Sequence, residues 1–267
     1  MSLVTVDHTL CRRDGICRAV CPMNLFEEDN ERFPVFRNGA EQNCIACGHC
    51  VAVCPNGALR HEKLPLEDAP LIDHSLTATA FAVDKLIRSR RSIREFSDEP
   101  VAKLLVEEVI DAARFAPSAI NRQPVEWLIV HTPAEVKRLA GLVVDYLRQS
   151  GEIGPRYAQI IERWDQGGDP ILRNAPHLVL VHAPKEWAWS TVDCTIALTQ
   201  FEMSAVAHGI GTCWAGFLIW AAREHPPIGE ALGLPAGNGV FGALMFGLPR
   251  YRYHRVPPRE QARIEWR

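Results

Sequence analysis

Apolar residues in the C-terminal two thirds of the chain recur at two spacings, which indicates a mixture of helices and strands. After Pro100, the apolar positions from Val101 to Ala113 fall every three or four residues, as on one face of a helix. Other apolar runs have the length of short buried strands. Beyond the first helix, the pattern predicts helices over 133–149 and 190–208, and strands over 125–131, 178–182 and 239–247.

These elements do not alternate as regular strand–helix–strand units, so they favour an α+β fold over a doubly wound parallel sheet. Residues 150–176, which contain several glycines and prolines, are predicted to be irregular, and residues 63–80 to be a linker. The segment 237–242 matches the glycine fingerprint of dinucleotide-binding proteins. Too few residues separate Gly242 from Pro249 for the helix that this fingerprint requires, so we interpret the segment as a turn that enters a strand.

Composition narrows the class of protein. The 267 residues are 47% hydrophobic and 23% charged, with a formal net charge of −3, as in soluble globular proteins. This balance gives no basis for nucleic-acid binding, which needs a concentrated basic surface. No secretion signal is recognisable at the N-terminus and no stretch of ~20 uninterrupted apolar residues suits a membrane span. We therefore expect a cytoplasmic protein without membrane segments.

Cysteines are concentrated at the N-terminus, where seven of the nine lie within the first 54 residues. The run from Cys44 to Pro55 has the spacing C-x₂-C-x₂-C-x₃-C-P, in which three thiolates hold one iron–sulfur cluster and the fourth ligates another. Zinc is the alternative, but zinc sites pair two shorter cysteine knuckles across a longer gap. The spacing therefore favours iron–sulfur clusters.

A degenerate copy of this motif precedes it, with Asp14 in place of the second cysteine. Residues 1–62 thus resemble a bacterial two-cluster ferredoxin. The resemblance implies that Cys44, Cys47, Cys50 and Cys21 hold one 4Fe-4S cluster, and that Cys11, Cys17 and Cys54 hold the other. Asp14 is either the fourth ligand of this second cluster or a turn residue beside a 3Fe-4S cluster. A carboxylate is a harder donor than a thiolate, so iron held by Asp14 would be the more labile.

Four later segments resemble the FMN-dependent nitroreductase family, and they span residues 85–260. They are RRSIREF (90–96), APSAINRQP (116–124), GIGTCWAGF (209–217) and FGLPRYRYHRVPPR (246–259). The resemblance implies an α+β fold with a sheet flanked by helices, and a homodimer with FMN at the subunit interface. The resulting domains are 1–62 (ferredoxin-like), 63–80 (linker) and 81–267 (nitroreductase-like).

The resemblance also implies which residues hold the flavin. Guanidinium groups and a hydroxyl in one short turn suit a phosphate, and near Gly216 a backbone N–H would face the flavin N5. Many relatives have an acidic side chain where this chain has Ala215, so a role there is left to the main chain. Of the tail arginines Arg250, Arg252 and Arg255, we favour the last two as further phosphate ligands. The implied set is Arg90, Ser92 and Arg94, with Arg91 adjacent; Pro117, Ser118 and Asn121 from the other subunit; the backbone of Ala215 or Gly216; and Arg252 and Arg255.

A ferredoxin fused to a flavin domain predicts an oxidoreductase, because a flavin converts single electrons into two-electron chemistry. We expect electrons to pass between the clusters and FMN and to reduce an electrophilic small molecule: a nitroaromatic, a quinone or an activated alkene. No catalytic side chain is identified. The alternative is a redox relay whose flavin exchanges electrons with a protein partner. An external ferredoxin or NAD(P)H are the candidate electron donors.

Overall fold

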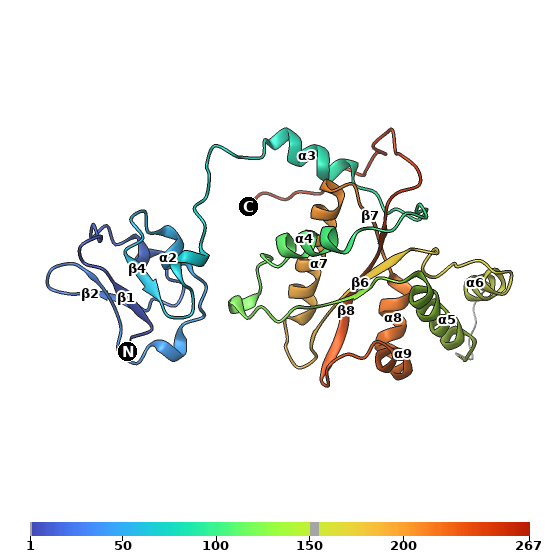
Figure 1. Ribbon diagram of the computed structural model, residues 1–267, viewed down its shortest axis with the longest axis horizontal. Helices are drawn as coiled ribbons and strands as arrows, with labels where there is room; N and C mark the ends of the chain where they lie inside the picture. Colours follow the sequence, from blue (N-terminus) through green and yellow to red (C-terminus); the bar gives the residue numbers. More distant parts are fainter. Residues whose placement is uncertain (1, 150–154) are drawn as a thin grey trace. The chain divides into compact units, whose positions relative to one another are not determined.

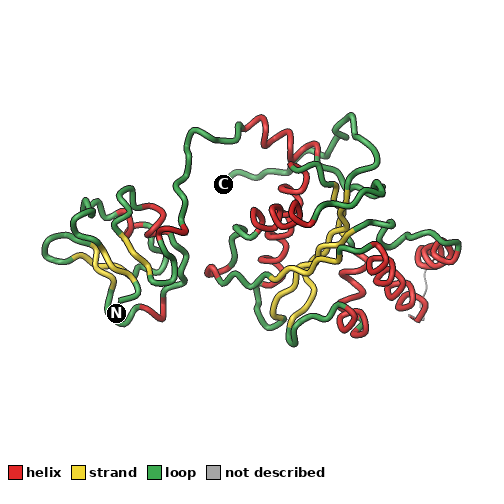
Figure 2. The backbone as a smooth tube through the Cα atoms, in the orientation of Figure 1, coloured by secondary structure: helices red, strands yellow, loops and turns green. Residues whose placement is uncertain are grey.

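The computed structural model describes residues 2–149 and 155–267, which form two compact units. Unit 1 contains the residues up to Thr77 together with Ala119–Arg122. Unit 2 contains Ala78–Ser118 and Gln123–Arg267. Figures 1 and 2 show small sheets and short helices in unit 1, and a larger sheet with long helices in unit 2. None of the helices described has the length and apolar character needed to cross a membrane.

Unit 1 is built from two similar halves. It contains two antiparallel strand pairs, β1 (Val4–Val6) with β4 (Leu59–His61) and β2 (Phe26–Glu28) with β3 (Pro34–Phe36). Each half carries one short helix, α1 (Ile16–Ala19) or α2 (His49–Val53). Both helices begin directly after a glycine in the left-handed region, Gly15 (φ 70°) and Gly48 (φ 73°), where a side chain would be strained. The local backbone therefore repeats the duplication seen in the sequence.

Unit 2 contains a four-stranded antiparallel sheet in the order β5-β6-β8-β7. The strands are β5 (Glu126–Val130), β6 (His177–Pro184), β7 (Gly211–Trp214) and β8 (Asn238–Gly247). The central strand β6 is buried on both faces, which explains its continuous apolar sequence. The antiparallel pairing confirms the predicted α+β class.

Helices cover both faces of this sheet, so that it lies between two apolar cores (Figure 1). Side chains alternate along β6: Leu178 and Leu180 face one core, whereas Val179 and Val181 face the other. All four are fully buried, and each burial stabilises the fold by about 1.5–3 kcal/mol. The first core also contains residues of α5 (Pro133–Gln149), α8 (Gly216–Glu224) and α9 (Pro226–Ala231); the second contains residues of α4 (Lys103–Ala113) and α7 (Ser190–Ala207).

The predicted helices and strands are found with small shifts at their ends, but residues 150–176 are not irregular throughout. A helix, α6 (Pro155–Asp165), occupies much of that segment, and residues 150–154 lie outside the described residues. Tyr157, Ile161 and Trp164 recur at helical spacing and pack against the first core, which stabilises α6 despite the nearby glycines. Another helix that the pattern did not indicate, α3 (Ala80–Ser89), begins at the hydroxyl cap of Thr79.

The glycine-rich segment 237–242 enters a strand, as the sequence indicates. Gly237 has φ 86°, and β8 begins at the next residue and runs to Gly247, so no helix follows the glycines. The dinucleotide-binding interpretation is therefore excluded by the fold.

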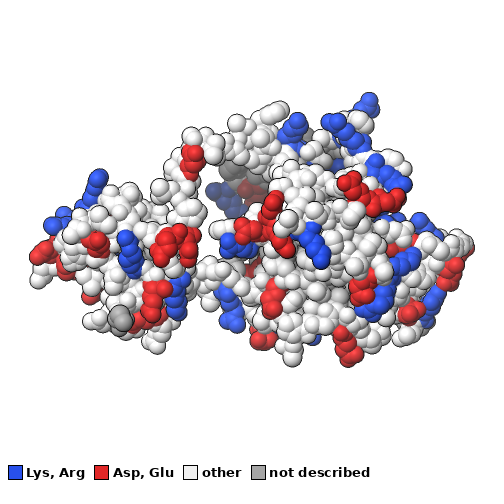
Figure 3. Space-filling view, viewed as in Figure 1, with Lys and Arg blue, Asp and Glu red and all other residues white. Residues whose placement is uncertain are grey.

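Charged side chains of both signs are interspersed on the visible face of each unit (Figure 3). This mixture agrees with a net charge near zero, and no broad basic face is seen there.

Candidate functional site

The structure brings the cysteines of unit 1 together as two sets, each drawn from both halves of the sequence duplication. One cavity is lined by the thiols of Cys21, Cys44, Cys47 and Cys50, together with apolar side chains such as Phe26. The other set contains Cys17, which interacts electrostatically with Asp14, Cys11 and Cys54. These groupings coincide with the crossed ligand sets that the resemblance implies.

Polar hydrogens point at several of these sulfur atoms, as expected around thiolates that carry charge. The backbone N–H of Leu25 donates to Cys21 Sγ (3.4 Å) and that of Ala58 donates to Cys54 Sγ (3.3 Å). The buried His61 lies 3.6 Å from Cys44 Sγ through Nε2, while its Nδ1 accepts the N–H of Lys63 (3.1 Å). In the neutral ring the proton is then on Nε2 and faces the sulfur.

Burial of these cysteines disfavours the thiolate form when no metal is bound. Burial raises the pKa of the Cys50 thiol to about 11, and burial also raises the pKa of Cys17. A bound metal supplies the positive charge that keeps such groups ionised. Over residues 2–149 and 155–267, no three His, Cys, Asp or Glu side chains converge on one point as a single ion would require. Thiols spread around a cavity fit a cluster of several irons better than one zinc ion.

The Asp14 carboxylate has a local hydrogen-bond partner in the described part of the chain. Its Oδ1 accepts the backbone N–H of Ile16 (3.2 Å) in the turn that precedes α1, and the side chain is grouped with Cys17. This geometry leaves the second carboxylate oxygen for iron and also suits a turn residue, so both interpretations of Asp14 stay open.

In unit 2, the segment that contains residues 90–94 lies alongside β7. The N–H of Ile93 donates to the carbonyl of Thr212 (2.8 Å), and Ser92 forms a bridge with the same residue. This contact brings Arg94 beside Cys213. Burial raises the pKa of the Cys213 thiol, and the Arg94 guanidinium offsets part of this increase. Gly211 permits the close approach, because a Cβ there would lie 2.6 Å from Ile93 Cγ1.

Gly211→Ala is expected to lower the free energy of unfolding of unit 2 by about 1–3 kcal/mol, because the added methyl group overlaps Ile93 and Pro249. Urea unfolding followed by tryptophan fluorescence measures this change. The control is Gly229→Ala in α9, where the added carbon meets nothing closer than 3.9 Å and alanine favours the helix. Equal stability of the two variants would contradict the packing argument.

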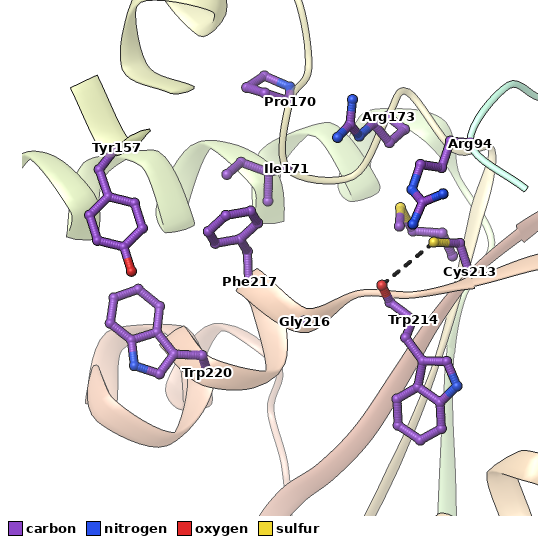
Figure 4. A pocket seen from close by; sticks show the side chains of 11 residues that line it. Arg94, Tyr157, Pro170, Ile171, Arg173, Cys213, Trp214, Gly216, Phe217 and Trp220 are labelled. Carbon is purple, nitrogen blue, oxygen red and sulfur yellow. Dashed lines mark hydrogen bonds between the residues drawn. The ribbon is translucent and has the colours of Figure 1, made fainter. Parts of the chain in front are cut away.

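An open cavity of about 460 Å³ lies at this point in unit 2 (Figure 4). Guanidinium groups of Arg94 and Arg173 lie on one side of it, beside Cys213. Aromatic rings line the rest: Tyr157 is stacked on Trp220 with 6.1 Å between ring centroids and 7° between planes. Cations at one side and flat apolar rings elsewhere suit a planar ligand that carries an anionic group. The lining residues are Arg94, Tyr157, Pro170, Ile171, Arg173, Cys213, Trp214, Gly216, Phe217, Trp220 and Met245.

Of the two backbone donors considered for a flavin N5, the geometry favours Gly216. The N–H of Ala215 donates to the carbonyl of Ala243 (3.0 Å), and Ala215 is 1% exposed. Gly216 lies at the first position of α8, where backbone N–H groups have no partner within the helix, and it lines the cavity. The backbone N–H of Gly216 is therefore the better placed of the two donors, and its contact with a flavin stays a prediction.

Several other predicted residues do not line this cavity, although Ser92 contacts the lining residue Cys213. Arg90 forms an ion pair with the buried Glu202 (3.3 Å), which also accepts a hydrogen bond from Thr212. Arg252 and Arg255 are exposed in the irregular tail. Arg91 and Ser92 are half-buried in the segment beside β7, and neither lines the cavity.

The loop that follows α4 has its own contacts. Pro117 and Ser118 line a smaller cavity of about 130 Å³, and Ser118 Oγ accepts the N–H of Gln123 (2.8 Å). Asn121 belongs to unit 1, where its amide donates to the carbonyls of Ile45 (3.2 Å) and Ala46 (2.9 Å). A flavin contact by these residues from a second subunit stays a prediction.

Sequence patterns missed Arg173, Tyr157 and Phe217. The first two lie in the segment predicted to be irregular, so no periodicity marked their direction. Phe217 directly follows Gly216 in a matched segment, and that position was the signal that could have found it.

Comparisons with known proteins agree with both units. Residues 87–248 match the nitroreductase family, and residues 9–59 match the 4Fe-4S dicluster domain. A putative NADH dehydrogenase/NAD(P)H nitroreductase of Archaeoglobus fulgidus is 28% identical over 62% of this chain and 84% of its own length. A nitrobenzene nitroreductase of Ectopseudomonas oleovorans is 24% identical over 62% and 86%.

Among solved structures, an FMN-bound nitroreductase of Bacteroides fragilis superposes with a TM-score of 0.58 at 20% identity, covering 68% of this chain and 98% of that protein. A nitroreductase of Desulfitobacterium hafniense, also with bound FMN, gives 0.57 at 24% identity, covering 68% and 97%. At these identities the likeness shows the fold.

Proposed function

The chain belongs to the nitroreductase family and carries an N-terminal 4Fe-4S dicluster domain, and from this premise we propose that it binds two iron–sulfur clusters and one FMN. Electrons would pass between the clusters and the flavin and reduce an electrophilic organic acceptor. The observation that carries the proposal is that one chain contains both crossed cysteine sets and a cavity with cations beside aromatic rings.

FMN, when bound, supplies the conversion between single electrons and hydride chemistry. The chain's own residues bind and orient it. Arg94 offers a planar fork for an anionic group, the Gly216 N–H offers a hydrogen bond at the start of α8, and the aromatic rings offer flat surfaces for stacking. In unit 1, the N–H donors to Cys21 and Cys54 stabilise the thiolates that hold iron.

A nitroaromatic is the first acceptor to test, because a 24% identical relative is a nitrobenzene nitroreductase and the cavity offers flat apolar surfaces such as Trp214. We propose a homodimer as the working form. Large apolar side chains are exposed on α3 and in the tail, where Phe81 is 78% and Trp266 is 90% exposed, and a second copy would cover them.

Protein purified without oxygen is expected to contain about one FMN and about eight irons per chain, or about seven if Asp14 adjoins a three-iron cluster. Iron, acid-labile sulfide and flavin analyses measure this content. About four irons, or zinc in place of iron, would contradict the two-cluster proposal.

Flavin reduction is then followed with NADH, NADPH or a reduced ferredoxin, before nitrobenzene or a quinone is added. Turnover with a soluble acceptor supports the enzyme. A flavin that is reduced but reoxidised only by a protein partner would instead identify a redox relay.

A further inference from the structure

Arg173 places a second guanidinium at the cavity of unit 2, beyond the residues that the sequence patterns and the resemblance marked. It lines the cavity together with Arg94, and Figure 4 shows both side chains near Cys213. Both also act on the Cys213 thiol, since each guanidinium favours its ionised form. Two residues 79 positions apart in the sequence therefore direct positive charge at one place.

The turn that carries Arg173 is held from several sides. The buried Asp169 carboxylate accepts the N–H groups of Ile171 (3.0 Å), Leu172 (2.8 Å) and Asn174 (3.1 Å). Arg173 itself has φ 61°, a left-handed conformation that is unfavourable for a residue other than glycine. A strained residue fixed by its surroundings in this way is typical of a functional position.

The acid that acts on the Cys213 thiol, Glu202, is itself paired with Arg90. Within the described ranges, neither Arg94 nor Arg173 has an ion pair with a carboxylate, and no aspartate or glutamate lines the cavity. The Arg94 side chain donates a hydrogen bond to the carbonyl of Ser92 (3.4 Å). Two neighbouring guanidinium groups repel each other, and a bound anion would relieve this repulsion.

We propose that Arg94 and Arg173 jointly bind one oxyanion in this cavity. The group is either the phosphate of the flavin or the carboxylate of an acceptor molecule. The inference rests on the proposed FMN-dependent function. It extends that function by assigning a ligand role to Arg173 and by making the second cation a determinant of which anion is held.

The test compares Arg173→Ala and Arg173→Lys with the parent in binding of FMN and of riboflavin, which lacks the phosphate. Arg163→Ala is the matched control, since Arg163 is exposed on α6 and does not line the cavity. If the oxyanion is the flavin phosphate, Arg173→Ala weakens FMN binding about 10-fold and leaves riboflavin binding unchanged. Arg173→Lys keeps the positive charge but loses the planar fork, so its FMN affinity should lie between that of the parent and that of Arg173→Ala.

If the oxyanion is a carboxylate of the acceptor, both flavins bind the variant as they bind the parent. The KM for 4-nitrobenzoate then rises about 10-fold, whereas the KM for nitrobenzene does not change. Equal losses of FMN and riboflavin binding, or no change in any of these quantities, would overturn the proposal.

A second experiment separates failure of the oxyanion site from failure of the FMN proposal. Inorganic phosphate should protect Arg173 of the full-length parent from modification by phenylglyoxal, as measured by peptide mass spectrometry. If the parent binds no flavin but phosphate still protects Arg173, the FMN proposal fails and the oxyanion site stands. The modification is measured on protein freed of flavin, before FMN is added back. Modification at the same rate with and without phosphate, in protein that then rebinds FMN, would overturn the oxyanion site alone.

Discussion

Arg94→Ala is expected to weaken FMN binding by roughly 10- to 150-fold. A charge-assisted hydrogen bond contributes about 1.5–3 kcal/mol, and each 1.4 kcal/mol is a factor of ten in affinity. Arg94 is the one arginine of the 90–94 segment that lines the cavity, whereas Arg90 is engaged by Glu202. Its replacement therefore removes charge from the cavity without breaking an ion pair of the fold.

Flavin fluorescence titration measures the effect, and Arg88→Ala provides the control. Arg88 is exposed on α3, where it pairs with Asp84 at 3.1 Å, and its loss should leave FMN affinity unchanged. Iron content should be the same in both variants, because the cysteines belong to the other unit. Retention of FMN by Arg94→Ala at the parent's affinity would remove the basis for placing an anionic group at this cavity.

Spacing and composition along the chain predicted those site residues whose functional groups come from one short segment. The cysteine spacing indicates clusters because three ligands come from one turn, and the duplication then implied that Cys21 joins Cys44, Cys47 and Cys50. Similarly, Arg94 follows from a short basic segment. The strand at 178–182 was predictable because a strand buried on both faces is apolar throughout.

The rest of the site depends on contacts that no local pattern encodes. Arg173 reaches the cavity only because Asp169 fixes a left-handed turn, and that turn lies in a segment that periodicity could not interpret. Likewise, the choice of Gly216 over Ala215 follows from one sheet hydrogen bond, between Ala215 and Ala243. Such pairings are set by the packing of whole elements, so they become visible only in the fold.

A buried histidine in unit 2 is expected to make stability depend on pH. His177 is fully buried, and its Nε2 accepts the backbone N–H of Val101 (3.0 Å). Its other nitrogen, Nδ1, donates to the carbonyl of His131 (2.9 Å), whose ring is stacked on it at 4.1 Å. A second proton would have to displace the Val101 hydrogen bond. Burial lowers the pKa of His177 from 6.5 to about 4, although the hydrogen bond to the His131 carbonyl raises it; the charge of the His131 ring has a smaller, lowering effect.

Because the folded pKa lies below the unfolded one, the unfolded chain binds more protons between pH 4 and 6.5. The contribution of His177 to stability is therefore complete above pH 6.5 and is lost as the pH falls, by about 3 kcal/mol at pH 4. His177→Gln can accept and donate at the same two places without titrating, so its free energy of unfolding should change less with pH than that of the parent.

Urea unfolding at several pH values, followed by tryptophan fluorescence, measures this difference. All seven tryptophans belong to unit 2, so the signal reports on that unit. His254→Gln, in the exposed tail, should keep the parent's pH dependence. A parallel pH dependence for His177→Gln and the parent would show that His177 is not the group whose protonation destabilises unit 2.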